Sequence, residues 1–282
     1  ETKAPTVISV EINSAATEGR LTYDSGAFGF LNAGDNVSVT ATFSERIFIV
    51  DNSSGNPTLT LAVGSDNRTA RYASGGDNST AMVFRYTIVS GDTDTDGINI
   101  RADSLALNSS TIRDAALNDA DLTHDAWSDN YSYIVDTTPP TVSGVAITNV
   151  VGAQNSFVNA GDNVSVTVTF SESPISAVIV DNPSAATLTM VVGSTNRTAT
   201  YYEGSNITPS VNDNSSLVFR YTIQATGTSG ETDSDGISIG ANALALNSGT
   251  IRDRAGNIAT DLTHSAVSDN SSYIVDTTLP TV

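Results

Sequence analysis

An acidic, proline-containing segment that occurs three times constrains the folding of this chain more than any other feature. In the middle it reads Val135-Asp136-Thr137-Thr138-Pro139-Pro140-Thr141-Val142, and related versions occupy residues 1–7 and 275–282. The sequence between successive copies of such a segment is expected to be one copy of a repeating unit. Proline fixes φ and pushes the preceding residue toward extended geometry, so the segment predicts a short, stiff connector.

Two units fit between the connectors, and each is long enough to be a domain. Solenoid repeats are about 20 to 50 residues long, whereas each of these units takes up roughly half of the chain and can bury its own core. We predict a first domain over residues 1–138 and a second over residues 139–282, which ends in the start of the next connector. Because the chain starts and ends inside a connector, we expect it to be an excerpt of a longer tandem array.

The two copies share strand-like blocks in the same order. Residues 32–40 return at 159–167, and residues 83–88 return at 218–223. Apolar residues alternate with Ser and Thr from Val37 to Phe43, which is typical of a strand with one buried face. About seven strands are expected in the first copy, near 6–12, 36–43, 57–63, 68–73, 81–89, 98–107 and 131–136. This pattern predicts an all-β fold of two tandem immunoglobulin-like β-sandwich domains joined by a short Pro-containing linker.

The charge balance excludes some partners and favours others. The chain has 31 acidic and 12 basic residues and a net charge of −19, which argues against binding to nucleic acid or to anionic membrane surfaces. No apolar run approaches the roughly 18 residues of a membrane-spanning helix, so no membrane insertion is expected. An excess of carboxylates instead favours solubility and the binding of cations.

Three acidic loops are expected to converge on the connector. In a sandwich with an odd number of strands, the chain enters at one pole and leaves at the other. This topology places the loop 92–97 beside Asp136, and it places Glu172 and the turn 253–257 where the second domain begins. Crowded carboxylates repel one another unless a cation lies among them. Oxygen ligands without His or Cys favour Ca²⁺ over transition metals.

The loop Asp92-Thr93-Asp94-Thr95-Asp96-Gly97 also has the spacing of a calcium loop, with Asp103 at the twelfth position. The second copy matches less well, with Glu231 first and Asn242 last. No flanking helices are expected, so the sequence predicts a calcium-binding turn and not an EF-hand. The alternative is a polar, solvated turn without an ion. The candidate calcium ligands are Asp92, Asp94, Asp96, Asp103, Asp136, Glu172, Asp253, Asn257, Glu231, Asp233, Asp235, Asp276, Glu45, Asp114 and Asn118.

Taken in order, these motifs resemble the bacterial Ig-like repeats in the extender regions of giant repetitive adhesins of the RTX or biofilm-associated type. The resemblance covers nearly the whole chain, twice. It implies a secreted or cell-surface protein that is not an enzyme, that binds Ca²⁺, that is monomeric, and whose partners are neighbouring repeats of the same chain. The first copy departs from the pattern at Leu117, where the second has Gly256. The residues that carry the resemblance are 135–140, 161–164, 170–172, 233–237 and 246–257.

The leading hypothesis is therefore a calcium-rigidified rod that projects a distal binding domain. The alternative is a ligand-binding module in which the loop Tyr202 to Asn214 or the segment around Trp127 grips a glycan or a surface. A glycosidase that uses paired carboxylates is disfavoured, because every acidic cluster is expected in a turn. The repeated His124 and His264 are expected to have a structural role.

Overall fold

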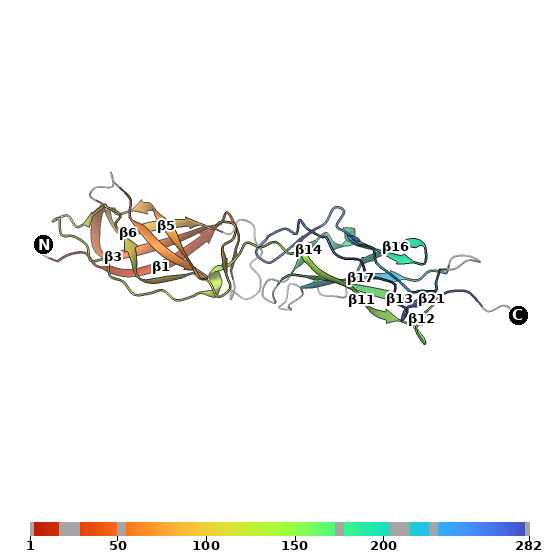
Figure 1. Ribbon diagram of the computed structural model, residues 1–282. Coiled ribbons are helices and arrows are strands. Elements are labelled where there is room, and N and C mark those ends of the chain that lie inside the picture. The colour runs from red at the N-terminus through yellow and green to blue at the C-terminus, as the bar shows by residue number, and fades with distance from the viewer. Residues whose placement is uncertain are drawn as a thin grey trace. The chain divides into compact units, whose positions relative to one another are not determined.

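The computed structural model describes residues 3–16, 29–49, 55–172, 178–202, 215–225 and 231–279. The chain divides into two compact units, Glu1–Thr138 and Pro139–Val282, each of which is described by itself. Both units are all-β, as the sequence predicts (Figure 1). The described residues hold two short 3-10 helices, η1 (Tyr131–Tyr133) and η3 (Pro183–Ala185), and no α-helix. None of the described helices is long and apolar enough to cross a membrane.

The first unit is built on one large antiparallel sheet and one small sheet. The large sheet has the order β1 (Val7–Ala16), β3 (Asn36–Ile49), β6 (Asp77–Thr87), β5 (Asp66–Gly75), β4 (Thr58–Val63), β8 (Asn99–Ala106), and β9 (Ile112–Arg113) also pairs with β3. The small sheet has the order β2 (Phe30–Leu31), β10 (Ile134–Asp136), β7 (Thr93–Asp94). Six of the strands expected from the sequence are confirmed, but the strand expected near 131–136 is wrong over residues 131–133, which form the helix η1, and only Ile134–Asp136 is a strand. The sequence did not predict the short strands β2, β7 and β9.

The second unit repeats this topology. Its large sheet has the order β11 (Val142–Val151), β13 (Asn163–Phe170), β17 (Ser216–Thr222), β16 (Thr195–Tyr201), β15 (Thr187–Val192), β19 (Leu244–Ala245). A small sheet follows the order β12 (Phe157–Val158), β21 (Ile274–Asp276), β18 (Thr232–Asp233), and β14 (Ile179–Asp181) pairs with β20 (Thr250–Arg252). The loop from Tyr202 to Asn214 lies, beyond its first residue, outside the described residues.

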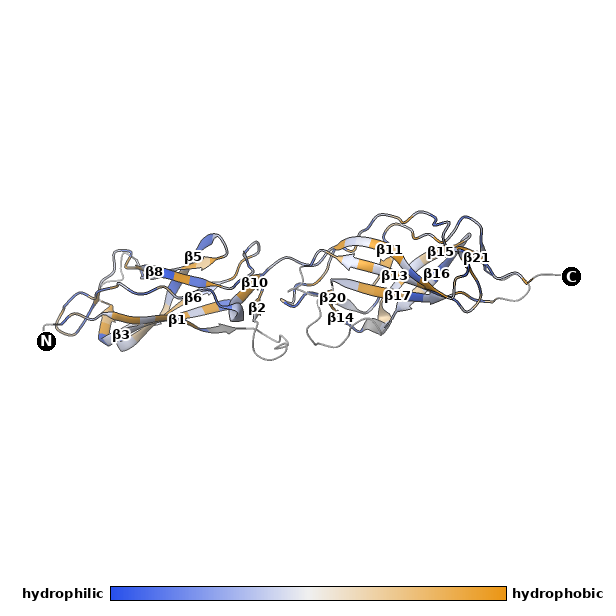
Figure 2. Ribbon diagram, turned by 90° about the horizontal axis from the view of Figure 1, so that it is seen from below, coloured by the Kyte–Doolittle hydropathy of each residue, from blue (hydrophilic) through white to orange (hydrophobic). Residues whose placement is uncertain are grey.

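The alternation of side chains builds a separate core in each unit. Val39 of β3 lies opposite Phe84 of β6, and Val166 of β13 lies opposite Phe219 of β17; all four side chains are fully buried. Figure 2 shows the resulting pattern, with hydrophobic bands alternating with paler ones along β11 and β13. Because one face of each strand is apolar, only this register buries the apolar set.

One segment connects the two edges of the large sheet in the first unit. Residues 121–127 meet β8 through an antiparallel bridge between Trp127 and Ile100, and they meet the start of β1 through a parallel bridge between Asp121 and Thr6. The sheet therefore curls so that its first and last strands face the same segment. The second unit has the equivalent antiparallel bridge between Ile239 and Val267.

The turn at Leu117 keeps the geometry of its counterpart despite the missing glycine. Leu117 has a φ of 70° and Gly256 has a φ of 88°, and both follow an aspartate that bonds to the asparagine after the turn. Left-handed backbone is uncommon for a branched residue because its Cβ crowds the following carbonyl. The Leu117 side chain is 65% exposed, so it recovers little energy by burial.

Replacing Leu117 with glycine should therefore stabilise the first unit, by about 1 kcal/mol in the free energy of unfolding. Denaturant unfolding followed by hydrogen exchange in the strands of the first unit measures the change. The reciprocal Gly256→Leu substitution is the matched control and should destabilise the second unit by a similar amount. A destabilised Leu117→Gly variant would contradict the assignment of strain to this turn.

Candidate calcium-binding site

Two carboxylates come together in the second unit where the connector joins it. The N–H of Ser171 donates to the carbonyl of Thr141 (2.8 Å), and the N–H of Thr141 donates to Ser171 Oγ (3.1 Å). These bonds hold the end of β13 against the connector, so Glu172 follows directly beside it. Thr6 and Ser44 make the same pair of bonds in the first unit, at 3.0 and 2.8 Å.

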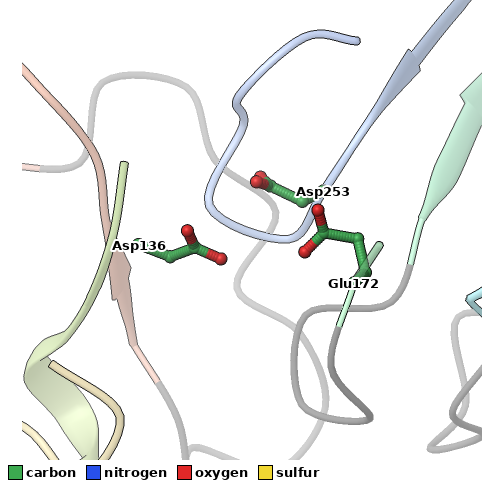
Figure 3. Close-up of side chains that lie close together, drawn as sticks. All are labelled: Asp136, Glu172 and Asp253. Carbon is green, nitrogen blue, oxygen red and sulfur yellow. The ribbon is translucent and has the colours of Figure 1, made fainter. Parts of the chain in front are cut away.

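Asp253 reaches the same place from the turn after β20. Its two carboxylate oxygens accept the backbone N–H of Asn257 (2.9 Å) and the Asn257 side-chain amide (2.8 Å), which fixes the orientation of the carboxylate. Asp253 is fully buried, and one of its oxygens lies within 4.8 Å of a Glu172 oxygen (Figure 3). Two ionised carboxylates at this separation repel by roughly 3 kcal/mol at the effective dielectric of a partly buried site. A divalent cation would reverse the sign of that interaction.

Asp136 is the last residue of β10, in the first unit, and is also drawn in Figure 3. Its Oδ1 accepts the N–H of Thr138 (3.0 Å), and Asp276 makes the same turn with Thr278 (2.9 Å) at the corresponding end of the second unit. Both Asp136 and Thr141 belong to the connector, and only residues 137–140 separate them, so the covalent chain itself limits the distance from Asp136 to Thr141. The shared site predicted for Asp136, Glu172 and Asp253 stays a prediction.

The first residue of the predicted calcium loop has protein partners of its own. Asp92 directly precedes Thr93, which pairs with Asp136 of β10, so this loop lies beside Asp136 as the topology predicts. The Asp92 side chain is fully buried. Arg68 Nε donates to Asp92 Oδ1 (2.6 Å), and the Tyr86 hydroxyl donates to Oδ2 (2.5 Å). Burial alone would raise the pKa of Asp92, but the hydrogen bonds from Tyr86, Val89 and Arg68 together lower it below its ordinary value. Burial and the bond to Asp92 raise the pKa of Tyr86 to about 12.

The rest of the loop divides into one buried and two exposed carboxylates. Asp94 accepts the N–H of Gly64 (2.7 Å) and of Gly97 (2.7 Å), and burial raises the pKa of Asp94 because it outweighs these bonds. Asp96 is exposed. Asp103 lies within β8 at a left-handed backbone position (φ 56°), where it accepts the N–H of His124 (2.9 Å). The twelve-residue spacing therefore does not form one continuous loop.

The second copy repeats this arrangement with one longer side chain. Glu231 replaces Asp92, and it accepts the hydroxyl of Tyr221 (2.5 Å) and forms an ion pair with Arg197 Nε that is not aligned as a hydrogen bond. Asp233 accepts the N–H of Gly193 (2.6 Å) and of Gly236 (2.9 Å), while Asp235 is exposed. Asn242 takes the place of Asp103 and accepts the N–H of His264 (2.9 Å).

The remaining candidates are counterparts of the Glu172 and Asp253 pair in the first unit. Asp114 is buried and accepts the Asn118 backbone N–H (2.8 Å) and side-chain amide (2.7 Å), the same turn that holds Asp253. Glu45 is the residue of β3 that corresponds to Glu172, and it is half-buried. The counterpart of Asp136 for this pair is Glu1, which lies outside the described residues.

Sequence reasoning missed the arginine and tyrosine partners of Asp92 and Glu231. A signal was present, because Asn-Arg-Thr-Ala occurs at 67–70 and again at 196–199, and the tyrosines stand in the repeated block 83–88 and 218–223. Repetition of a basic residue in so acidic a chain could have indicated a buried acidic partner. The two histidines have the structural role expected of them, since each imidazole accepts a backbone N–H, from Ser104 and Ala243 (2.9 and 2.8 Å).

No protein-family model matches the chain, and no curated protein matches it either. The residues described above are therefore the basis on which a function can be assigned.

Asp92→Asn should lower the free energy of unfolding of the first unit by about 2 kcal/mol at neutral pH, because it weakens hydrogen bonds to a buried charge. Since the folded-state pKa of Asp92 is lowered, its carboxylate stabilises the unit above the ordinary aspartate pKa, and this contribution is lost as the pH falls through the lowered value. Denaturant unfolding between pH 2 and 7 should show a smaller acid dependence in the variant.

The matched control is Asp66→Asn, which removes another carboxylate from the same arginine. Asp66 lies 2.9 Å from Arg68 Nη2, but its side chain is 59% exposed. An exposed ion pair contributes less than about 1 kcal/mol. If Asp92→Asn and Asp66→Asn lowered the free energy of unfolding equally, burial of Asp92 would not strengthen its interaction with Arg68.

Proposed function

We propose that this chain is a non-enzymatic extender module of a secreted or surface-anchored bacterial adhesin, made of two tandem immunoglobulin-like domains whose connector is stiffened by Ca²⁺. The observation that carries the proposal is the buried Asp253 beside Glu172, placed where the connector enters the second unit. An enzyme requires a single active site, whereas a spacer is built by repeating the same domain and the same connector many times. The repeat of both domain and connector supports a spacer.

The topology supports the immunoglobulin-like assignment. Each unit combines a large antiparallel sheet, whose first strand lies beside the next long strand of the chain (β1 beside β3, β11 beside β13), with a small sheet that contains the last strand. Short strands joined by turns, with cores made from alternating residues, are the properties of such sandwiches. The disulfide and the buried tryptophan of antibody domains are not required, because the apolar strand faces already supply a core in each unit.

Calcium would act by neutralising negative charge at the connector. Glu172 and Asp253 offer the hard oxygen ligands that Ca²⁺ prefers, and Ca²⁺ takes six to eight of them. Asp136 is proposed as a further ligand because only four residues separate it from the connector's contact with Ser171. Proline limits bending of the connector, and an ion that binds only the ordered arrangement would stabilise it according to its concentration. Rigidity would then depend on the external calcium level.

The cellular role follows from the same chemistry. A stiff spacer with an acidic surface would keep a distal binding domain away from the cell, and its partners would be the neighbouring repeats of its own chain. Extracellular calcium would keep the sites filled. The proposal therefore places the protein at the bacterial surface or in the secreted fraction, as a monomer without nucleic-acid partners.

Glu172→Gln should weaken calcium binding about tenfold or more, because it removes one charged ligand while leaving the folded turn at Asp253 intact. Isothermal titration with Ca²⁺ measures this. Asp136→Asn should have a similar effect, and a normal affinity in that variant would confine the site to the second unit. Asp77→Asn, which removes an exposed carboxylate elsewhere, is the control. If all three variants behaved alike, general acidity would explain the binding.

Chelation of calcium should broaden the distribution of angles between the two units, since the connector would lose its neutralising ion. Small-angle scattering of the whole chain, with calcium and with chelator, measures this distribution. Glu172→Gln should give the broad distribution even with calcium present. The rigid-spacer proposal fails if the profile is the same in both solutions.

A further inference from the structure

An equivalent groove runs beside the first strand of the large sheet in each unit. In the first unit it has a volume of about 540 Å³ and lies between β1, the segment 123–127 and the turn at Asp103. In the second unit it has a volume of about 530 Å³ and lies between β11, the segment 263–267 and Asn242. Neither groove includes Asp136, Glu172 or Asp253, the carboxylates proposed to bind calcium at the connector.

The groove of the first unit exists because two backbone edges separate. Within the described residues, β1 pairs along its length with β3 only, and the N–H of Val7 donates to the carbonyl of Asp121 (3.2 Å), so its other edge is open beyond Val7. The segment 121–127 touches β1 through Asp121 and then turns toward β8, where Trp127 pairs with Ile100. An open strand edge offers N–H and C=O groups to an added strand.

The wall of the groove is fixed by a histidine in both units. In the first, Ser104 N–H donates to His124 Nε2 (2.9 Å), and His124 N–H donates to Asp103 (2.9 Å). In the second, His264 makes the corresponding bonds with Ala243 and Asn242. The two grooves therefore share one framework, so a difference in their ligands must come from the side chains that line them.

The side chains that line the two grooves differ in charge and in aromatic character. Glu11, Asp103, Asp125 and Trp127 line the groove of the first unit, where Ile8 is also 64% exposed. Their counterparts in the second unit carry no negative charge: Ala146, Asn242, Ser265, Val267 and Ser143. No lysine or arginine is among the residues that line either groove.

We propose that the groove of the first unit binds an extended peptide segment that carries lysine or arginine side chains. The peptide would lie along the open edge of β1, where backbone hydrogen bonds provide affinity without sequence preference. Its cationic side chains would meet Glu11, Asp103 and Asp125, and one of them would pack on the indole of Trp127. The groove of the second unit, which has the same framework without these groups, would not bind it.

Trp127 provides the measurement, because it is the only tryptophan in the chain. The full chain is titrated with a synthetic peptide of alternating Lys and Val, and with a Glu and Val peptide of the same length. The Lys peptide should change the indole fluorescence with saturation, and its affinity should fall as salt is added. Calorimetry should give one peptide per chain. Two equal sites per chain, or equal binding of the Glu peptide, would overturn the proposal.

The variant Glu11→Gln, Asp103→Asn, Asp125→Asn should bind the Lys peptide about tenfold more weakly, from the loss of three exposed charge contacts. Asn242 already makes the bond to histidine in the second unit, so Asp103→Asn preserves the wall. Asp77→Asn is the control, and circular dichroism checks that each variant folds. Unchanged affinity in the triple variant overturns the proposal. The proposal is also overturned if the indole fluorescence responds to a neutral oligosaccharide and not to the Lys peptide. That result would identify a glycan site.

Discussion

The need to bury carboxylates in a chain with few basic residues governs this structure. With 31 acidic and 12 basic residues, most buried acids must find hydrogen-bond donors other than lysine or arginine. Backbone N–H groups supply them: Asp35 and Asp162 accept from the residue three positions earlier, and Asp114 and Asp253 from the asparagine four positions later. Each such aspartate fixes a turn at the end of a strand. Buried charge that is fully hydrogen-bonded in this way orders loops without disulfides.

The two copies show which of these interactions can vary. Exchanging Asp92 for Glu231 lengthens the acid, yet an arginine and a tyrosine contact it in both units. A left-handed turn is kept even where Leu117 stands in place of glycine. The left-handed backbone at Leu117 is thus kept at some cost in conformational free energy, since the strands on both sides of the turn require it. The charged residues that line the first groove, Glu11, Asp103 and Asp125, are exposed and outside the core, and at these positions the copies differ in charge.

The acids consequently belong to two groups with different consequences. Asp92, Asp94 and Asp114 are buried and bonded within the protein, so their protonation bears on folding. Asp96 and Asp235 are exposed, and the partly exposed Glu172 lies beside a buried aspartate. The second group can respond to ions in solution without the fold being opened first, and Asp253 belongs to both groups, because its buried, hydrogen-bonded carboxylate lies beside Glu172. The calcium dependence proposed for a spacer and its acid stability are therefore expected to arise mainly from different residues.

The sequence by itself determined the all-β class, most of the strand spans and the repeat, because two-residue periodicity and turn formers are local properties of the chain. It also placed the loop 92–97 beside Asp136, since strand order fixes which loops share a pole. It did not show that residues 131–133 form a 3-10 helix before the last strand. Only the tertiary structure decided that Arg68 and Tyr86 hold Asp92, and that the segment 121–127 leaves a groove along β1. These depend on how the sheet curls, which brings together residues that are distant in sequence, and no local pattern encodes that curvature.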